Sequence, residues 1–240
     1  MTAENPTAKP TRSTILEKLG LHRPELRAWA MYDWANSAMV TTIVTAVFPI
    51  YFARVAASDL PKETATARYA LASTVSMIII AILAPLLGAI ADYSPVKKKL
   101  LAMFLSTGVL ATAGMFFIHT GDWLLAMVLF IVAYVGAAGS FVFYDSLLPH
   151  IAHGSEMDRL STTAYALGYL GGGLLLAANL AWIKLPHWFG LPSGENLTES
   201  QLTLPTRLAL VSVAVWWFLF ALPMFLRVPE PASRHGGNKR

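Results

Sequence analysis

The sequence predicts an all-α integral membrane protein with six transmembrane helices. Apolar residues make up 55% of its 240 residues, and the mean hydropathy is +0.53. Only 13% of the residues are charged, whereas about a quarter are charged in a typical soluble domain. The charge deficit extends over most of the chain, in runs that approach or exceed the roughly 20 apolar residues needed to cross a bilayer.

Six apolar runs qualify as membrane spans, and Asp33 is the only formally charged residue inside them. In chain order they are Ala30–Phe52, Tyr69–Ala91, Leu100–Ile118, Trp123–Tyr144, Thr162–Ile183 and Leu208–Leu226. A soluble helix of this length would present a charged stripe on one face. Strands of a membrane barrel would be about ten residues long and would alternate apolar with polar residues. Continuous helices therefore explain these runs best.

The polar segments between the runs predict the connections and the orientation. The expected connections are Ser94–Lys99, His119–Asp122, Pro149–Ser161 and Lys184–Arg207. Thirteen Lys and Arg residues lie on the side of both chain ends, against five on the other side. The positive-inside rule makes the first side cytoplasmic. We therefore expect a cytoplasmic segment over 1–28, a membrane domain over 29–227 and a disordered cytoplasmic tail over 228–240.

Composition excludes several classes of function. The basic residues sit between apolar runs and form no continuous stripe, so the net charge of +4 does not indicate nucleic-acid binding. The absence of cysteine excludes disulfide frameworks and cysteine-based metal or redox sites. No apolar h-region occurs in the first 26 residues, so a cleaved signal peptide is not expected. We predict a multi-pass protein of the cell membrane.

A polar stripe opens the first run. Asp33, Asn36 and Ser37 have the i, i+3, i+4 spacing of one helix face, and Thr41 follows one turn later. A carboxylate is costly in lipid, so Asp33 is expected to face protein or a water-filled cavity. One interpretation is a site for a substrate amine or a proton. The alternative is a helix-end aspartate that reaches water among the headgroups.

The cytoplasmic end of the fourth run carries a second carboxylate. Tyr144 ends this run and Asp145 follows it, at the level of Asp33, because odd and even spans are antiparallel. Asp145 either lines a shared inner vestibule with Asp33 or simply ends its helix in water. The predicted substrate or proton pathway is therefore Asp33, Asn36, Ser37, Thr41, Tyr144 and Asp145.

Small residues predict close helix packing in the fourth and fifth runs. The predicted packing residues are Gly136, Gly139, Ser140, Gly168, Gly171, Gly172 and Gly173. In the fifth run, a flexible point in a gating helix is the alternative interpretation. His150 and His153 lie three residues apart but lack a further ligand nearby, so we predict no metal site and no cofactor.

The end of the second run resembles a signature of the major facilitator superfamily. Gly88 is followed four residues later by Asp92 and then by the basic cluster Lys97, Lys98 and Lys99. The glycine lets another backbone approach, the aspartate can meet a helix N-terminus, and the lysines are expected in headgroup water. Tyr93 stands where the superfamily has a basic residue, and Pro95-Val96 replaces a glycine and a following basic residue.

Four separated blocks resemble one branch of that superfamily, the vacuole-effluxer-like family, which includes the fungal autophagy-related vacuolar amino-acid effluxers. The blocks are Trp29-Ala-Met-Tyr-Asp-Trp-Ala-Asn-Ser, Val47-Phe-Pro-Ile-Tyr-Phe52, Phe143-Tyr-Asp-Ser-Leu-Leu-Pro149 and Ala166-Leu-Gly-Tyr-Leu-Gly-Gly-Gly173. The resemblance implies twelve helices in two halves, alternating access and solute efflux. The chain corresponds to the first half, so Gly88 and Asp92 lack their usual partner within it.

The expected function is that of a secondary-transporter half that moves small solutes such as amino acids. Its expected partners are the lipid bilayer, the solute, and either a second copy or a separate C-terminal half. In that pairing, Gly88 and Asp92 are expected to meet the partner's fifth span around residues 168–173. The alternative is a non-transporting membrane protein, either a truncated relic or an assembly partner. An enzyme is not expected, because no paired catalytic groups lie deep in the spans.

Overall fold

The computed structural model describes residues 14–93 and 96–230, and all regular secondary structure in these residues is helical. Six segments are long and apolar enough to cross a membrane, which confirms the predicted fold class. A short helix, α1 (Ile15–Lys18), precedes them. The six spans are Pro24–Ala56, Lys62–Ala91 in α4 (Lys62–Tyr93), Lys97–Phe117 with α5 (Lys97–Gly114), α6 (Trp123–Ile151), α7 (Ser155–Lys184) and α8 (Glu199–Arg227).

The helices are longer than the apolar runs that predict them. The predicted Pro149–Ser161 connection shrinks to residues 152–154, because α6 and α7 both continue beyond their apolar segments. The last connection also shortens, because a capping box between Thr198 and Gln201 starts α8 at Glu199. Apolar content marks the hydrocarbon layer, whereas helical hydrogen bonding continues into the polar region beyond it.

The first span is not a uniform α-helix. It consists of α2 (Pro24–Ala38), the π-helical segment η1 (Met39–Ala46), the short helix α3 (Phe48–Tyr51) and the π-helical segment η2 (Phe52–Ala56). Pro49 has no backbone N–H, so the regular hydrogen-bond ladder cannot run through this region. The amide of Val47 donates instead to the carbonyl of Thr42, five residues back, at 2.8 Å. Segments of π-helix inside α-helices frequently occur at functional sites.

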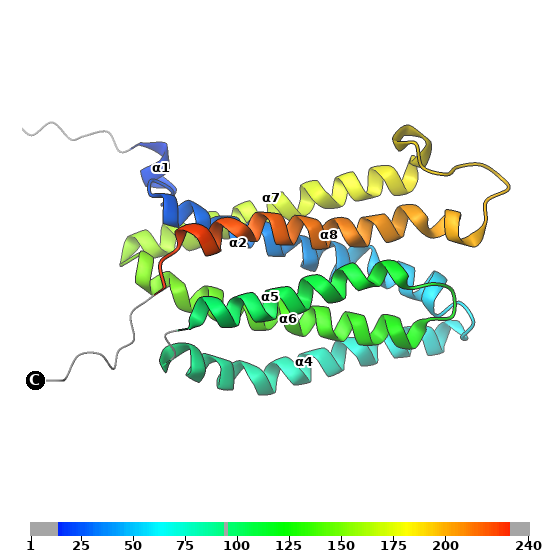
Figure 1. The fold of residues 1–240 in the computed structure, drawn as a ribbon, viewed down its shortest axis with the longest axis horizontal. Helices are drawn as coiled ribbons and strands as arrows, with labels where there is room; N and C mark the ends of the chain where they lie inside the picture. The colour runs from blue at the N-terminus through cyan, green and yellow to red at the C-terminus, as the bar shows by residue number, and fades with distance from the viewer. Residues whose placement is uncertain (1–13, 94–95, 231–240) are drawn as a thin grey trace, which may run out of the picture.

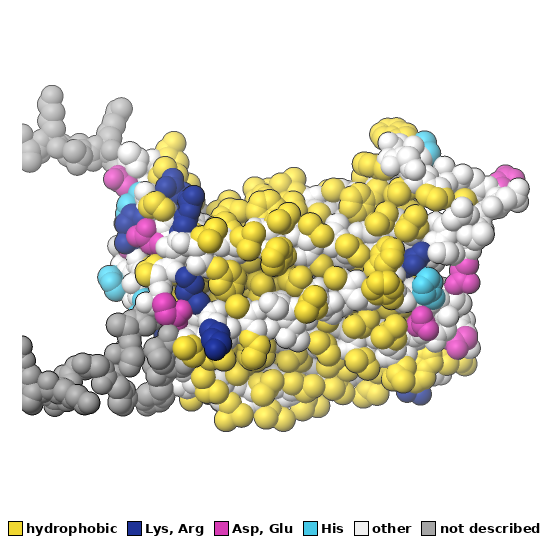
Figure 2. Space-filling model, in the orientation of Figure 1, with side chains coloured by type: hydrophobic (Ala, Val, Ile, Leu, Met, Phe, Trp, Pro, Cys, Tyr) yellow, Lys and Arg dark blue, Asp and Glu magenta, His cyan; other side chains and the backbone are white. Residues whose placement is uncertain are grey.

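The six spans form one elongated bundle (Figure 1). Helix α2 packs mainly against α7 and α8, whereas α6 packs mainly against α4 and α5. The buried core includes Trp29, Tyr32, Phe48, Phe130 and Trp217, each at most 2% exposed. Figure 2 shows hydrophobic side chains over the middle of the visible face and charged side chains at the two ends, as expected for a protein that crosses a bilayer.

Polar contacts hold the start of α2 against the turn between α6 and α7. The Arg23 guanidinium donates to the carboxylate of Glu156 at 2.8 Å and to the carbonyl of Ile151 at 2.6 Å. The His22 imidazole also lies 3.3 Å from Glu156. These contacts fix the position at which α2 enters the bundle beside α7.

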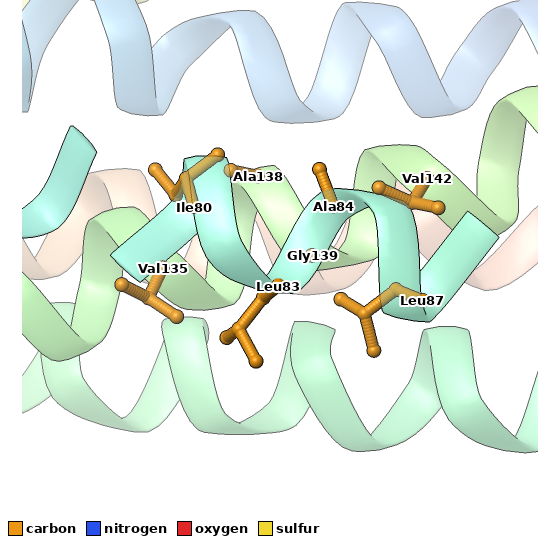
Figure 3. Close-up of a pocket in the computed structure, with 8 residues that line it drawn as sticks. All are labelled: Ile80, Leu83, Ala84, Leu87, Val135, Ala138, Gly139 and Val142. Carbon is orange, nitrogen blue, oxygen red and sulfur yellow. The ribbon is translucent and has the colours of Figure 1, made fainter. Parts of the chain in front are cut away.

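The contact between α4 and α6 leaves a narrow apolar gap of about 10 Å³ (Figure 3). Leu83 and Leu87 of α4 and Val135 and Val142 of α6 are among the side chains around it. This volume is at the lower limit for a single water molecule, and the walls offer no polar side chain. The gap is a packing feature and not a ligand site.

Candidate functional site

The polar stripe of α2 lies against α7. The Ser37 hydroxyl donates to Asp33 Oδ1 at 3.4 Å, so these two side chains form a pair one helical turn apart. The Thr41 hydroxyl contacts the carbonyl of Ser37 at 3.1 Å and the carbonyl of Gly172 on α7 at 3.2 Å. Asp33, Ser37 and Thr41 are all half-buried. The stripe therefore has one edge in the helix contact and one edge open.

Glycines on α7 make this contact possible. A Cβ atom on Gly168 would lie 2.5 Å from Ser37 Oγ and 3.0 Å from Asp33 Oδ1. A Cβ on Gly172 would lie 2.9 Å from Thr41 Oγ1. Real Cβ atoms do not show contacts under 3.0 Å, so the polar stripe reaches this distance from α7 because Gly168 and Gly172 lack a side chain. The glycine face of α7 is thus occupied within this chain.

The same geometry corrects two expectations for α7. Gly171 is buried under the Trp34 ring, whereas Gly173 is exposed and a Cβ there would meet nothing within 4 Å. Gly173 therefore takes no part in the close helix packing that the sequence predicts for it. Because Gly168, Gly171 and Gly172 face α2, they are not free to receive the second span of a partner.

Tyr144 and Asp145 are neighbours on α6 with different surroundings. The Tyr144 ring is buried and stacks between Trp29 at 4.3 Å and Tyr32 at 4.8 Å, measured between ring centroids. The indole N–H of Trp29 also donates to the Tyr144 carbonyl at 3.1 Å. These contacts attach α6 to α2, whereas the Asp145 side chain is exposed.

The two carboxylates of the predicted pathway lie near each other. Asp33 and Asp145 are close enough to interact electrostatically, although they come from different helices. Asp33 is half-buried and Asp145 is exposed, so neither carboxylate is enclosed by the bundle. This pair can attract a cation or exchange a proton.

Asn36 lies away from the open edge of the stripe. Its side chain is fully buried, in contrast to the half-buried Asp33 and Ser37. Within residues 14–93 and 96–230, neither its amide oxygen nor its amide nitrogen has a hydrogen-bond partner. The i, i+3, i+4 spacing spreads over a wide arc of the helix, so Asn36 turns into the bundle while Asp33 and Ser37 remain at its surface.

The lysine cluster after α4 does not simply face headgroup water. Lys97 is only 5% exposed, and its ammonium donates to the carbonyl of Ser146 at 3.2 Å and lies 3.0 Å from His150 Nε2. The expectation of a solvated lysine is therefore wrong for Lys97, which attaches α5 to the end of α6. Lys99 is exposed, as expected.

Lys98 caps the end of α8. Its ammonium donates to the carbonyls of Phe225 and Val228, both at 2.7 Å. The last carbonyls of a helix have no partner within it, so a cation at this end satisfies them and complements the helix dipole.

The remaining signature residues have less defined surroundings. Gly88 is half-buried, and a Cβ there would meet nothing within 4 Å. Asp92 belongs to the last turn of α4, but its side chain lies outside the described parts of the structure. Most of the predicted C-terminal tail, residues 231–240, also lies outside the described residues.

The small residues of α6 pack against α5. A Cβ on Gly136 would lie 2.6 Å from the backbone nitrogen of Gly108, and one on Gly139 would lie 2.3 Å from the Phe104 ring. Ser140 is buried and donates to the carbonyl of Ala137 at 2.6 Å. This seam contains no ionisable side chain and holds the two helices together.

Sequence reasoning overlooked an aromatic pair beside the stripe. Tyr165 and Tyr169 project from α7 and are each 61% exposed. Their hydroxyls are 2.9 Å apart, and their rings meet edge to face at 4.8 Å. Tyrosine in membrane helices is enriched at the interfaces. Tyr165 is the fourth residue of the predicted span Thr162–Ile183, so two tyrosines spaced i, i+4 near this end of the span were an interfacial signal that could have been used.

Two other features add no chemistry to this site. An apolar groove of about 600 Å³ lies between α7 and α8, but no ionisable side chain lines it. Among the described residues, no group of three His, Cys, Asp or Glu side chains is placed to hold a metal ion.

Comparisons with known proteins identify a family to which the chain is similar. The model of a family described as "Vacuole effluxer Atg22 like" matches residues 60–238. YxiO of Bacillus subtilis (strain 168), described as an uncharacterized MFS-type transporter, is 35% identical over 204 residues, which cover 85% of this chain and 46% of YxiO. An uncharacterized protein of Aquifex aeolicus (strain VF5) is 24% identical over 164 residues, or 68% of this chain and 40% of that protein.

The chain thus spans less than half the length of these curated relatives. No solved structure matches it.

Proposed function

Because the chain belongs to the vacuole effluxer Atg22-like family of MFS-type transporters, we propose that it forms half of a secondary transporter. This half moves small solutes, such as amino acids, across the cell membrane by alternating access. Six membrane-spanning helices and the resemblance of separated sequence blocks support this proposal. The direction of movement is outward, as the family description suggests.

The observation that carries the proposal is the carboxylate pair of Asp33 and Asp145. A carboxylate facing lipid is expensive, so a half-buried aspartate inside a span indicates a protected aqueous path. Asp33 has this position, is paired with Ser37 and is close to the exposed Asp145. The pair serves as the binding point for the solute or for a coupling proton.

The distribution of basic residues supports a cytoplasmic position for both chain ends. Lys97 and Lys98 belong to the side that carries thirteen of the eighteen Lys and Arg residues. In the bundle, α1, the start of α5 and the end of α8 lie at one end (Figure 1). By the positive-inside rule this end faces the cytoplasm.

A second six-helix unit completes the transporter in this proposal. Halves of the superfamily are parallel repeats related by an axis along the membrane normal. A second copy or a separate chain can therefore supply the opposite wall. The contact uses the open face that carries Asp33 and Asp145, since the glycines of α7 are already covered by α2.

Solute movement in sealed vesicles that contain only this chain tests the proposal. The parent is expected to move a mixture of amino acids above the rate of empty vesicles, and Asp33→Asn is expected to abolish that excess. Asp158→Asn is the matched control, because Asp158 is an exposed carboxylate near the start of α7. If the parent equals empty vesicles, the version in which two copies of this chain suffice fails, and a separate second half or the non-transporting alternative is left.

A further inference from the structure

A groove of about 230 Å³ lies between the start of α2 and the end of α8. It is lined by Arg27, Ala28, Met31, Pro223, Leu226 and Arg227. Guanidinium groups from two helices and apolar side chains thus share one hollow. Lys and Arg side chains also gather at this end of the visible face of the bundle (Figure 2). The groove is separate from the polar stripe, since neither Asp33 nor Ser37 lines it.

Neither arginine of the groove is neutralised by the chain. Arg27 and Arg227 are exposed, and among the described residues neither guanidinium forms a hydrogen bond or an ion pair. The acidic residues nearest to them in the sequence bind elsewhere. Glu25 pairs with Arg23 at 3.0 Å, and Glu230 accepts from a backbone amide of α5 at 3.1 Å. The groove therefore carries two positive charges that an anionic ligand can meet.

The negative end of the α8 dipole is also offset. The last carbonyls of a helix repel an anion placed beside them. Here the ammonium of Lys98 donates to the carbonyls of Phe225 and Val228, both at 2.7 Å. A third cation thus reduces the repulsion that an anion beside Arg227 would meet.

Each helix places its arginine one turn outside an apolar side chain. Arg27 precedes Met31 by four residues, and Arg227 follows Pro223 by four, so each pair shares one helix face. Four residues correspond to about 6 Å along a helix. Both arginines lie just outside predicted spans, and Leu226 beside them is 81% exposed. The guanidinium groups are therefore expected at the level of the lipid headgroups, above an apolar floor at the edge of the hydrocarbon.

We propose that this groove binds one anionic phospholipid. Its phosphate lies between Arg27 and Arg227, and the upper part of its acyl chains covers Met31, Pro223 and Leu226. Guanidinium groups bind phosphate oxygens through paired hydrogen bonds, and basic pockets between membrane helices bind anionic headgroups. The volume is below the roughly 300–1,000 Å³ of pockets that enclose a whole drug-sized ligand, so the groove holds the headgroup and the chains remain in the bilayer.

Native mass spectrometry of the full chain in detergent measures the retained lipid. Phosphatidylglycerol and zwitterionic phosphatidylcholine with the same acyl chains are titrated separately. The parent is expected to retain one phosphatidylglycerol more tightly than phosphatidylcholine. Arg27→Gln and Arg227→Gln are each expected to weaken phosphatidylglycerol binding by about 5-fold, which is the effect of one arginine at an anionic membrane surface.

Matched variants separate this groove from net charge. Arg159→Gln removes an exposed arginine of α7 that does not line the groove, and it is expected to bind the lipid like the parent. Arg27→Lys and Arg227→Lys keep the charge but lose the paired hydrogen bonds, so each is expected to fall between the parent and its glutamine variant. Circular dichroism is expected to match the parent throughout, because these arginines are exposed.

Four outcomes overturn the inference. They are equal affinity of the parent for the two lipids, unchanged phosphatidylglycerol binding in both glutamine variants, an equal loss in Arg159→Gln, and displacement of the lipid by excess glycerol 3-phosphate, which would identify a site for free anions. A dimer that the glutamine variants lose would instead assign the groove to a second copy and reject the lipid. Lipid retention is measured without transport, so its result does not depend on the proposed function.

Discussion

Two pairs of helices in this bundle approach closely at glycines, but they use the short distance differently. Between α5 and α6, Gly136 faces the backbone of Gly108. Between α2 and α7, Gly168 faces the side chains of Asp33 and Ser37. The first contact brings backbones together without ionisable groups, whereas the second creates room for a carboxylate inside a span.

The comparison shows that a small-residue pattern has no fixed meaning in a membrane helix. Close backbone approach provides van der Waals packing between helices. The same approach beside a polar stripe lets a costly charge be partly covered by protein. We therefore call the first contact the packing seam (Gly108, Gly136 and Gly139) and the second the polar seam (Asp33, Ser37, Thr41, Gly168 and Gly172). If the two seams differ in this way, substitutions in the first mainly lower stability and substitutions in the second mainly lower transport.

The largest loss of stability is expected in the packing seam. Gly136→Ala places a Cβ 2.6 Å from Gly108 N and 2.7 Å from Gly108 Cα, and backbone atoms cannot move aside easily. Overpacking of this kind costs about 3 kcal/mol. Thermal unfolding in detergent measures it, with the open position Gly173→Ala as the control. Equal melting temperatures for the two variants would show that the seam is looser than described.

A smaller loss of stability, but a larger loss of transport, is expected in the polar seam. Gly168→Ala places a Cβ 2.5 Å from Ser37 Oγ, which is a side-chain atom that can rotate away. The cost is about 1 kcal/mol, at the low end for overpacking. Solute movement in vesicles is expected to fall more than 10-fold, because Asp33 is displaced. Normal transport by this variant would remove the distinction between the two seams.

The start of α5, where Lys98 meets the end of α8, offers a third test outside both seams. Lys98→Ala removes two hydrogen bonds to the last carbonyls of α8, and a loss of about 1 kcal/mol is expected after allowance for the half-buried position. The exposed Lys99→Ala is the matched control and is expected to unfold like the parent. If both variants lose the same stability, net charge and not the cap explains the effect.

The smallest effect is expected at Thr41, the last residue of the polar stripe along the first span. Thr41→Val removes the hydroxyl that contacts Gly172 O and Ser37 O, at a cost of about 0.5 kcal/mol. Thr107→Val is the control, because the exposed Thr107 hydroxyl bonds only within its own helix among the contacts described. A sharper loss at Thr41 than at Gly168 would show that this hydrogen bond, and not the glycine, holds α2 to α7.

Part of the candidate site was predictable from the free-energy cost of placing a charged group in a bilayer. Asp33 is the single charged residue in an apolar run, and such a residue is expected to face protein or water and to have a functional role. The spacing of residues along a helix was a less precise guide to which side chains are exposed. Asn36 shares the spacing of the stripe but is buried, and Gly173 shares the glycine run of Gly171 and Gly172 but is exposed. Sequence spacing places residues within an arc, and the neighbouring helix decides which part of that arc is covered.

The sequence by itself determined the number of spans, their approximate positions and the presence of a carboxylate that requires shelter. These properties depend on transfer between water and lipid, which each segment experiences alone. Only the tertiary structure decided that α7 lies against the stripe, that Lys97 attaches α5 to α6, and that Lys98 caps the end of α8. Such features depend on contacts between segments far apart in the chain, and the composition of a single segment does not predict them.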